Sequence, residues 1–145
     1  MGFDLYGLKA KNKTGEYFRN NVWWWRPLAN YVMEVCTITD TDGWHTNSGH
    51  KVTRKQAAEL YEKLHTELKR GNTKKYEAAY TKRMNALPNE PCHLCKGEGT
   101  YQRNPCHVCS KTGEVDNWEK SYPFTSENVS EFATFVKDSG GFKIL

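Results

Sequence analysis

Apolar positions repeat at helical spacing in the middle of the chain, between residues 53 and 71. They recur every three or four positions, which is the period of one face of an α-helix. Thr53 and Gln56 have the spacing of a capping box, and Gly71 suits the left-handed turn that ends many helices. The sequence therefore predicts a helix here, with a buried stripe formed by Ala57, Leu60, Tyr61, Leu64 and Leu68.

Two further helices are predicted nearer the C-terminus. The first is capped by Thr73, ends before Pro88 and, after so short a turn, is expected to pack on the preceding helix as an antiparallel helical hairpin. The second is capped by Ser126 and ends at the pair Gly140–Gly141. Its inward positions are Val129, Phe132, Ala133, Phe135 and Val136, and a short tail with Phe142, Ile144 and Leu145 is expected to dock after it.

The N-terminal region predicts a strand hairpin and one helix. Phe3 and Leu5 indicate a strand, residues 9–15 have turn chemistry, and residues 17–19 can return as a second strand. Pro27 fits the first turn of a helix that continues to Cys36, and residues 39–49 form a polar loop. The predicted fold class is α+β: a small N-terminal hairpin packed with about four helices, plus a cysteine-rich knuckle pair.

Composition indicates a globular chain with an aromatic core. Only 37% of the 145 residues are apolar, but 13% are Phe, Trp or Tyr, whose rings bury a large area each. The length suggests a single domain covering residues 1–145. No apolar run approaches the roughly 18 residues of a membrane span, and the first residues lack the features of a signal peptide. We therefore expect a cytoplasmic protein without a membrane partner.

The cysteines carry the strongest chemical pattern in the chain. Two C-x-x-C pairs, Cys92 with Cys95 and Cys106 with Cys109, are separated by ten residues. Zinc takes four thiolates tetrahedrally, and in a reducing compartment such pairs indicate metal rather than disulfides. We predict one structural zinc ion on these four ligands, within a zinc-knuckle subregion at 91–113. A four-thiolate site has no open coordination position, so this ion is not catalytic.

The cysteine segment resembles the C-x-x-C-x-G-x-G repeat of DnaJ-type co-chaperones. The first copy matches in full, and the second has Lys111 where the first has Gly97. The resemblance implies a half-size version of that zinc motif, with two repeats where the co-chaperones have four. The remaining cysteine, Cys36, is expected to be a small buried hydrophobic residue on a helix face.

A second resemblance concerns the N-terminal segments MGFDLYG and RNNVWWWRPL. They are similar to small phage and prophage proteins, and small zinc proteins of that kind include anti-CRISPR inhibitors. The resemblance implies a protein partner, with a CRISPR effector nuclease as the expected one, met in the cytoplasm of the host cell.

Two sets of side chains are candidates for partner contact. Trp23, Trp24 and Trp25 are followed by Arg26, and on a helix three consecutive rings fan over about 200°, so they cannot all enter one core layer. The second set is the basic tip of the predicted helical hairpin, formed by Lys69, Arg70, Lys74 and Lys75. Residues 51–87 around it hold ten Lys or Arg and four Glu, whereas the whole chain has a formal net charge of +4, or about +2 with a bound zinc-thiolate centre.

Enzyme motifs are lacking. Asp40, Asp42, His45 and His50 share one polar loop, but the spacing of the two histidines fits neither a helix face nor a strand face. We therefore predict a non-enzymatic zinc-binding interaction protein that inhibits a host-defence nuclease by protein–protein contact and so interferes with its use of nucleic acid. The alternative is a nucleic-acid-binding zinc module that uses the basic hairpin.

Overall fold

The computed structural model describes residues 1–37 and 41–145 as two compact units. Unit 1 comprises Met1–Tyr80 and Tyr122–Leu145, and unit 2 comprises Thr81–Ser121. Unit 2 is therefore an insertion in the chain of unit 1, and the cysteine subregion at 91–113 lies entirely within it. At the junction the Tyr80 hydroxyl donates a 2.6 Å hydrogen bond to the carbonyl oxygen of Tyr122, so unit 1 itself joins the two chain segments. The fold is α+β, as the sequence predicts.

An antiparallel sheet forms one layer of unit 1. Within the described residues it has four strands in the order β2-β1-β8-β3. The predicted N-terminal hairpin is confirmed as β1 (Gly2–Gly7) paired with β2 (Tyr17–Asn21). The predicted tail forms β8 (Phe142–Ile144), which lies between β1 and the short β3 (His50–Val52). The last residues of the chain thus supply a central strand.

The first helix, α1 (Val22–Val35), begins five residues before the predicted position at Pro27. The side chain of Asn21 accepts a 3.1 Å hydrogen bond from the Trp24 N–H and so caps the helix directly at the end of β2. Pro27 therefore lies inside the helix rather than in its first turn, and the three tryptophans occupy the first helical turn.

The other helices are α2 (Arg54–Lys69), α3 (Asn72–Asn85) and α4 (Ser126–Ser139). The capping box of α2 is confirmed, and Gly71 follows it with φ of +74°. The predicted hairpin of α2 and α3 is wrong, because α2 packs along α4 instead. The apolar face of α4 contacts the apolar stripe of α2. Thr73 is not a cap, since it is completely buried inside α3 with its hydroxyl 2.7 Å from that of Ser126. The side chain of Thr125, not Ser126, caps α4.

Aromatic rings fill the core between the sheet and the helices. Trp25 stacks between Phe3 and Trp44, with ring centroids 5.5 and 5.8 Å away, and its indole N–H donates to the Trp44 carbonyl oxygen. Phe132 and Phe142 close the cluster from α4 and β8. All five predicted inward positions of α4 are buried. The prediction of an aromatic core is confirmed.

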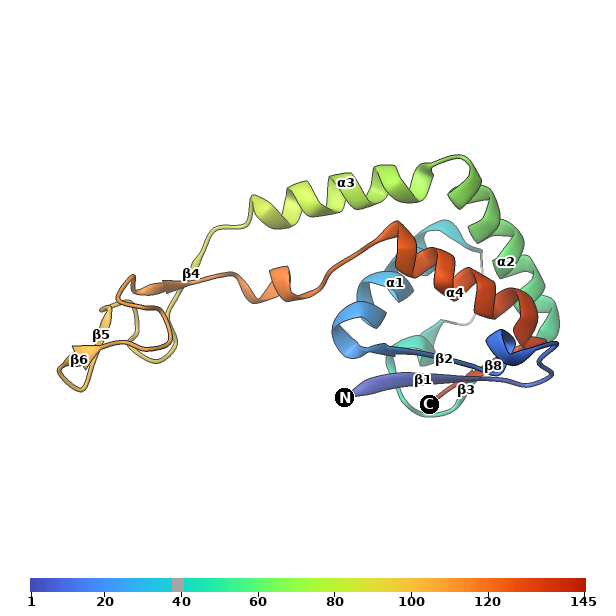
Figure 1. The fold of residues 1–145 in the computed structure, drawn as a ribbon, viewed down its shortest axis with the longest axis horizontal. Helices are drawn as coiled ribbons and strands as arrows, with labels where there is room; N and C mark the ends of the chain where they lie inside the picture. Colours follow the sequence, from blue (N-terminus) through green and yellow to red (C-terminus); the bar gives the residue numbers. More distant parts are fainter. Residues whose placement is uncertain (38–40) are drawn as a thin grey trace. The chain divides into compact units, whose positions relative to one another are not determined.

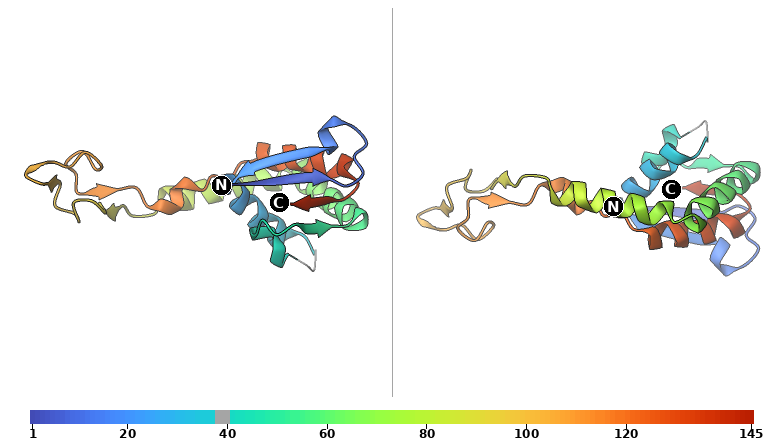
Figure 2. Two further views of the ribbon diagram at one scale, coloured as in Figure 1. Left: turned by 90° about the horizontal axis from the view of Figure 1, so that it is seen from below. Right: turned by 90° about the horizontal axis from the view of Figure 1, so that it is seen from above.

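The helices leave one face of the sheet uncovered. Helices α1, α2 and α4 lie on the same side of the strands, as Figure 1 shows for unit 1. When the same unit is seen from below in Figure 2, the strands lie in front of these helices. Among the described residues, none of the helices is long and apolar enough to cross a membrane.

Candidate metal centre

Unit 2 is built from two short strand pairs around the cysteines. Strand β4 (Glu90–Pro91) pairs with β7 (Glu114–Val115), and β5 (Thr100–Tyr101) pairs with β6 (Asn104–Pro105). Cys92 directly follows β4 and Cys106 directly follows β6, and each C-x-x-C pair forms a tight turn. The pairing therefore brings two turns that are fourteen residues apart in sequence to the same place.

The four predicted ligands meet at one point. Their sulfur atoms all lie within 4.8 Å of one another, with Cys92 Sγ 3.8 Å from Cys106 Sγ and Cys95 Sγ 3.7 Å from Cys109 Sγ. A tetrahedral site with zinc–sulfur bonds of about 2.3 Å has sulfur–sulfur edges of about 3.8 Å. All four side chains are buried, at 0 to 6% exposure. The cluster can therefore hold one metal ion shielded from solvent.

Backbone hydrogen bonds join the two C-x-x-C repeats to each other. The Cys92 N–H donates to the carbonyl oxygen of Gly113 at 2.8 Å, and the Cys106 N–H donates to that of Gly99 at 3.0 Å. The same glycines donate their own N–H groups to cysteine sulfurs, Gly99 to Cys95 at 3.2 Å and Gly113 to Cys109 at 3.3 Å. Each repeat thus supplies one amide to its own thiolate and one carbonyl to the other repeat.

Close backbone approach explains why glycine stands at these two positions. A Cβ at Gly99 would lie 2.5 Å from the Lys111 carbonyl oxygen, and a Cβ at Gly113 would lie 2.4 Å from that of Gly97. Both glycines also have φ of +77°, which L side chains disfavour. The glycines shared with the co-chaperone motif are therefore required by the crossing of the two repeats.

Strained backbone is concentrated in this unit. In residues 1–37 and 41–145, five non-glycine residues have φ between +51° and +74°, and all lie in unit 2: Lys96, Gln102, Arg103, Ser110 and Lys111. Each left-handed L residue costs about 1 kcal/mol or more. Against this cost the unit has little apolar packing, since Leu94 and Val115 are the partly buried apolar side chains that pack on the cysteine cluster.

Hydrogen bonds from backbone N–H groups favour the thiolate form of Cys106 and Cys95, whereas burial raises the pKa of the Cys109 thiol to about 11. Hydrogen bonding from the Cys109 N–H, more than the opposing burial, lowers the pKa of the Cys106 thiol to about 7. Burial is the largest influence on the Cys95 thiol and opposes its ionisation. Hydrogen bonds from the Gly99 N–H, from the Cys109 and Cys92 thiols and from the Gly97 N–H together outweigh it, so the pKa of Cys95 lies below its ordinary value. His93 and His107, inside the two turns, are exposed and are not among the clustered ligands.

The candidate contact residues at the start of α1 differ in how much of each side chain is exposed to solvent. Trp25 is completely buried in the core, so it cannot be a contact residue. Trp23 is 44% exposed and packs against the Tyr122 ring at 4.8 Å, Trp24 is half-buried, and Arg26 is exposed. The expectation that the three rings cannot share one core layer is confirmed.

The basic tip lies where α2 meets α3. Lys69, Arg70, Lys74 and Lys75 are all exposed on either side of Gly71. The nearby Glu67 is buried and forms a 3.2 Å ion pair with Lys63, and the charge of Arg70 in the tip also helps to lower the pKa of its carboxyl. The tip is a solvent-accessible cluster of four positive side chains, although it joins two helices that do not form a hairpin.

Among its described residues, the histidine-containing loop forms no cluster of metal ligands. His45 Nε2 lies 3.0 Å from the Asn30 amide oxygen, and burial, followed by the charge of Arg26, lowers the pKa of its imidazole. His50 belongs to β3, and Asp40 falls outside the described residues. In the described part of the chain, the four cysteines are the one group of three or more His, Cys, Asp or Glu side chains close enough to share a metal ion.

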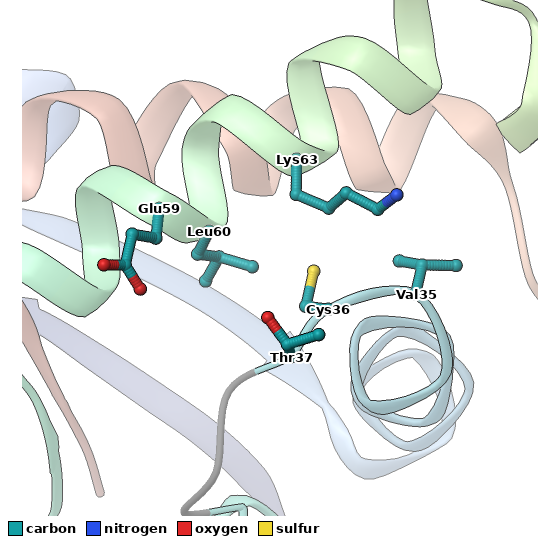
Figure 3. Close-up of a pocket in the computed structure, with 6 residues that line it drawn as sticks. All are labelled: Val35, Cys36, Thr37, Glu59, Leu60 and Lys63. Atoms are coloured by element: carbon teal, nitrogen blue, oxygen red, sulfur yellow. The ribbon is translucent and has the colours of Figure 1, made fainter.

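Cys36 belongs to unit 1, where it follows the last residue of α1. With Val35 and Thr37 it faces Glu59, Leu60 and Lys63 of α2 across a small pocket, as Figure 3 shows. Burial raises the pKa of the Cys36 thiol to about 11. The residue is half-buried rather than fully buried, and at neutral pH it is a protonated thiol, not a nucleophile.

Comparison with known proteins found no matching family model, no matching curated protein and no matching solved structure. The sequence and the geometry described above therefore carry the functional argument by themselves.

Proposed function

We propose that this chain is a non-enzymatic zinc-binding interaction protein in which the zinc ion is structural. The observation that carries the proposal is the closed cluster of four buried thiols, whose spacing matches the edges of a zinc–thiolate tetrahedron. Four sulfurs complete the coordination of zinc, so no position is left for water or substrate. The ion would therefore fix the shape of unit 2 and supply no chemistry.

Metal analysis of the purified protein tests the first part. Elemental analysis should give one zinc per chain, and Cys92→Ser should lower the zinc content and the melting temperature together. Cys36→Ser is the matched control, because Cys36 belongs to unit 1 and is not one of the clustered cysteines. A zinc-free wild-type protein with unchanged melting would refute the structural role of the metal.

The absence of catalysis is part of the same proposal. It is supported by the closed coordination of the four cysteines and by the contact of His45 Nε2 with the Asn30 amide oxygen. Nuclease and phosphatase assays with added magnesium or manganese should stay at background. Metal-dependent cleavage that disappears in His45→Ala and His50→Ala would replace this proposal with a metal-dependent nuclease.

The specific form we propose is an inhibitor of a host-defence nuclease, in the manner of anti-CRISPR proteins. It rests on the resemblance of the N-terminal segments to small phage proteins, and exposed Trp23 and Arg26 are the residue types that dominate protein interfaces. Purified CRISPR effector complexes should lose target cleavage when the protein is added in excess. Trp23→Ala should weaken inhibition, whereas Trp118→Ala, at an exposed ring of unit 2 outside both candidate sets, is the control and should inhibit like wild type. Full cleavage by every effector tested would reject this form.

The alternative is a nucleic-acid-binding zinc module, favoured by the exposed basic tip at Lys69, Arg70, Lys74 and Lys75. Lysine contacts with phosphates release counterions and make binding steeply dependent on salt. Charge reversal at Lys74 and Lys75 would then abolish binding to any nucleic acid. In the inhibitor form, the same variant would only slow association with the protein partner.

A further inference from the structure

We propose that the uncovered face of the main sheet in unit 1 binds single-stranded nucleic acid. This surface is distinct from the basic tip and from the tryptophans of α1, and it goes beyond the function proposed above. Its residues come from strands that are far apart in sequence, β1 and β2, β3 and β8, so the sheet is what brings them together.

Strand register places one row of side chains straight across the sheet. Tyr17 pairs with Tyr6, Tyr6 with Lys143, and Lys143 with Lys51. Successive residues of a strand point to opposite faces, and the neighbours of this row, such as Leu5, Phe142 and Val52, are buried under the helices. The row itself therefore points away from the helices, and all four of its members are exposed.

The row has two aromatic rings at one end and two positive charges at the other. Tyr6 and Tyr17 are 47% and 45% exposed, and their ring centroids are 5.2 Å apart. A second row carries Arg19, paired with Asp4 on β1 at 3.6 Å, and then Leu145. The Tyr17 hydroxyl also donates to the Asp4 carboxylate. The single acid in these two rows is thus already engaged by two neighbours, and the side chains of the face are net basic.

This combination suits unpaired bases better than other partners. Aromatic rings on neighbouring strands of an open sheet can each stack on a base, while adjacent Lys and Arg side chains contact the phosphates. Bases of a duplex are already stacked and unavailable to such rings. The centres of protein interfaces are depleted in lysine, which makes a protein partner the weaker match for a face with Lys51 and Lys143.

The test measures binding of the zinc-loaded full-length protein to a fluorescent oligothymidine of about 12 nucleotides by anisotropy. Binding should be at least tenfold tighter than to a duplex of equal length. Tyr6→Ala and Tyr17→Ala should each weaken binding by about fivefold or more. Tyr6→Phe keeps the aromatic ring and should bind like the wild type. Tyr101→Ala, at an exposed tyrosine of unit 2, is the matched control and should leave binding unchanged.

Charge variants test the phosphate contacts separately. Lys51→Gln and Lys143→Gln should each reduce the slope of log affinity against log salt by about 0.7, whereas Lys74→Gln should not. Asp4→Asn should strengthen binding, because it frees Arg19 and removes the negative charge.

Three results would overturn the proposal. The first is no binding by folded, zinc-loaded wild type at low salt, and the second is equal affinity for duplex and single strand. The third is loss of binding in the Lys74 variant with the sheet-face variants unaffected, which would place the contact at the basic tip. Failure of the inhibitor proposal alone would leave all of these measurements unchanged.

Discussion

Removing the metal should unfold unit 2 and leave unit 1 folded. The five left-handed non-glycine residues described in unit 2 cost about 1 kcal/mol each, or about 5 kcal/mol together. Full burial of Leu94 and Val115 would contribute about 3 to 6 kcal/mol, which roughly cancels that strain. Two two-residue strand pairs and a few turn hydrogen bonds are then left to offset the entropy of ordering the backbone, which costs about 1 to 2 kcal/mol per residue. The free energy of zinc binding, about 10 to 16 kcal/mol in small zinc domains, has to stabilise the unit.

Hydrogen exchange read by mass spectrometry separates the two units. After chelation, peptides containing Cys92 and Cys106 should exchange freely, because their amides are protected by carbonyl groups of the opposite repeat. Peptides from α1 and α4 should keep their protection, since their buried faces belong to the aromatic core of unit 1.

Cys92→Ser should reproduce the effect of chelation without a chelator, and Cys36→Ser should not. The reasoning is refuted if zinc-free protein, verified by elemental analysis, keeps slow exchange at Cys92 and Cys106. Loss of protection in α4 together with unit 2 would show instead that the two units unfold as one.

Three other substitutions test the remaining structural arguments. Lys111→Gly should stabilise unit 2 by about 1 kcal/mol in denaturant unfolding of zinc-loaded protein, because Lys111 has φ of +74° and glycine adopts it freely; an unchanged midpoint would contradict this. Trp25→Ala should cost about 3 to 5 kcal/mol in urea unfolding, whereas Trp23→Ala, at a 44% exposed ring, should cost less than about 1 kcal/mol; equal costs would disprove the core assignment. Burial raises the pKa of the Glu67 carboxyl, but hydrogen bonds from Asn72 and Lys63, with the charges of Lys63 and Arg70, outweigh burial and the net pKa is lowered. The carboxylate therefore stabilises the fold at pH values above the unfolded pKa of 4.5, and this stabilisation is lost as the pH falls. The stability difference between wild type and Glu67→Gln should therefore be largest at neutral pH and shrink in acid, and a constant difference would count against the ion pair.

The sequence predicted those helices and strands whose formation depends on residues close together in the chain. The capping box at Thr53 and the stripe of α2 were readable because both depend on residues within one or two helical turns. The packing partner of α2 could not be predicted from the sequence. The short connection to α3 suggested α3 as the partner, but α2 packs on α4. Trp44 lies in a polar stretch of the sequence, and it is buried by rings that are distant along the chain: Trp25, Phe132 and Phe142.

The same division holds for the functional candidates. The cysteine ligands were predictable because C-x-x-C is a local motif with fixed chemistry. The left-handed turn at Gln102 and Arg103 was not, because neither residue is one of the glycines or asparagines that usually indicate such a turn. The open sheet face joins Tyr6 to Lys143, a pairing that only the strand order defines.

The central position of β8 has a consequence for biosynthesis. Strands β1 and β3 have no shared neighbour until residues 142–144 have left the ribosome, so the sheet of unit 1 cannot close before the whole inserted unit has been translated. The knuckle residues at 91–113 emerge earlier and need only each other and a metal ion. The inserted unit should therefore be the first part of the nascent chain to reach its final structure, and the supply of zinc in the cell would act before the larger unit has folded.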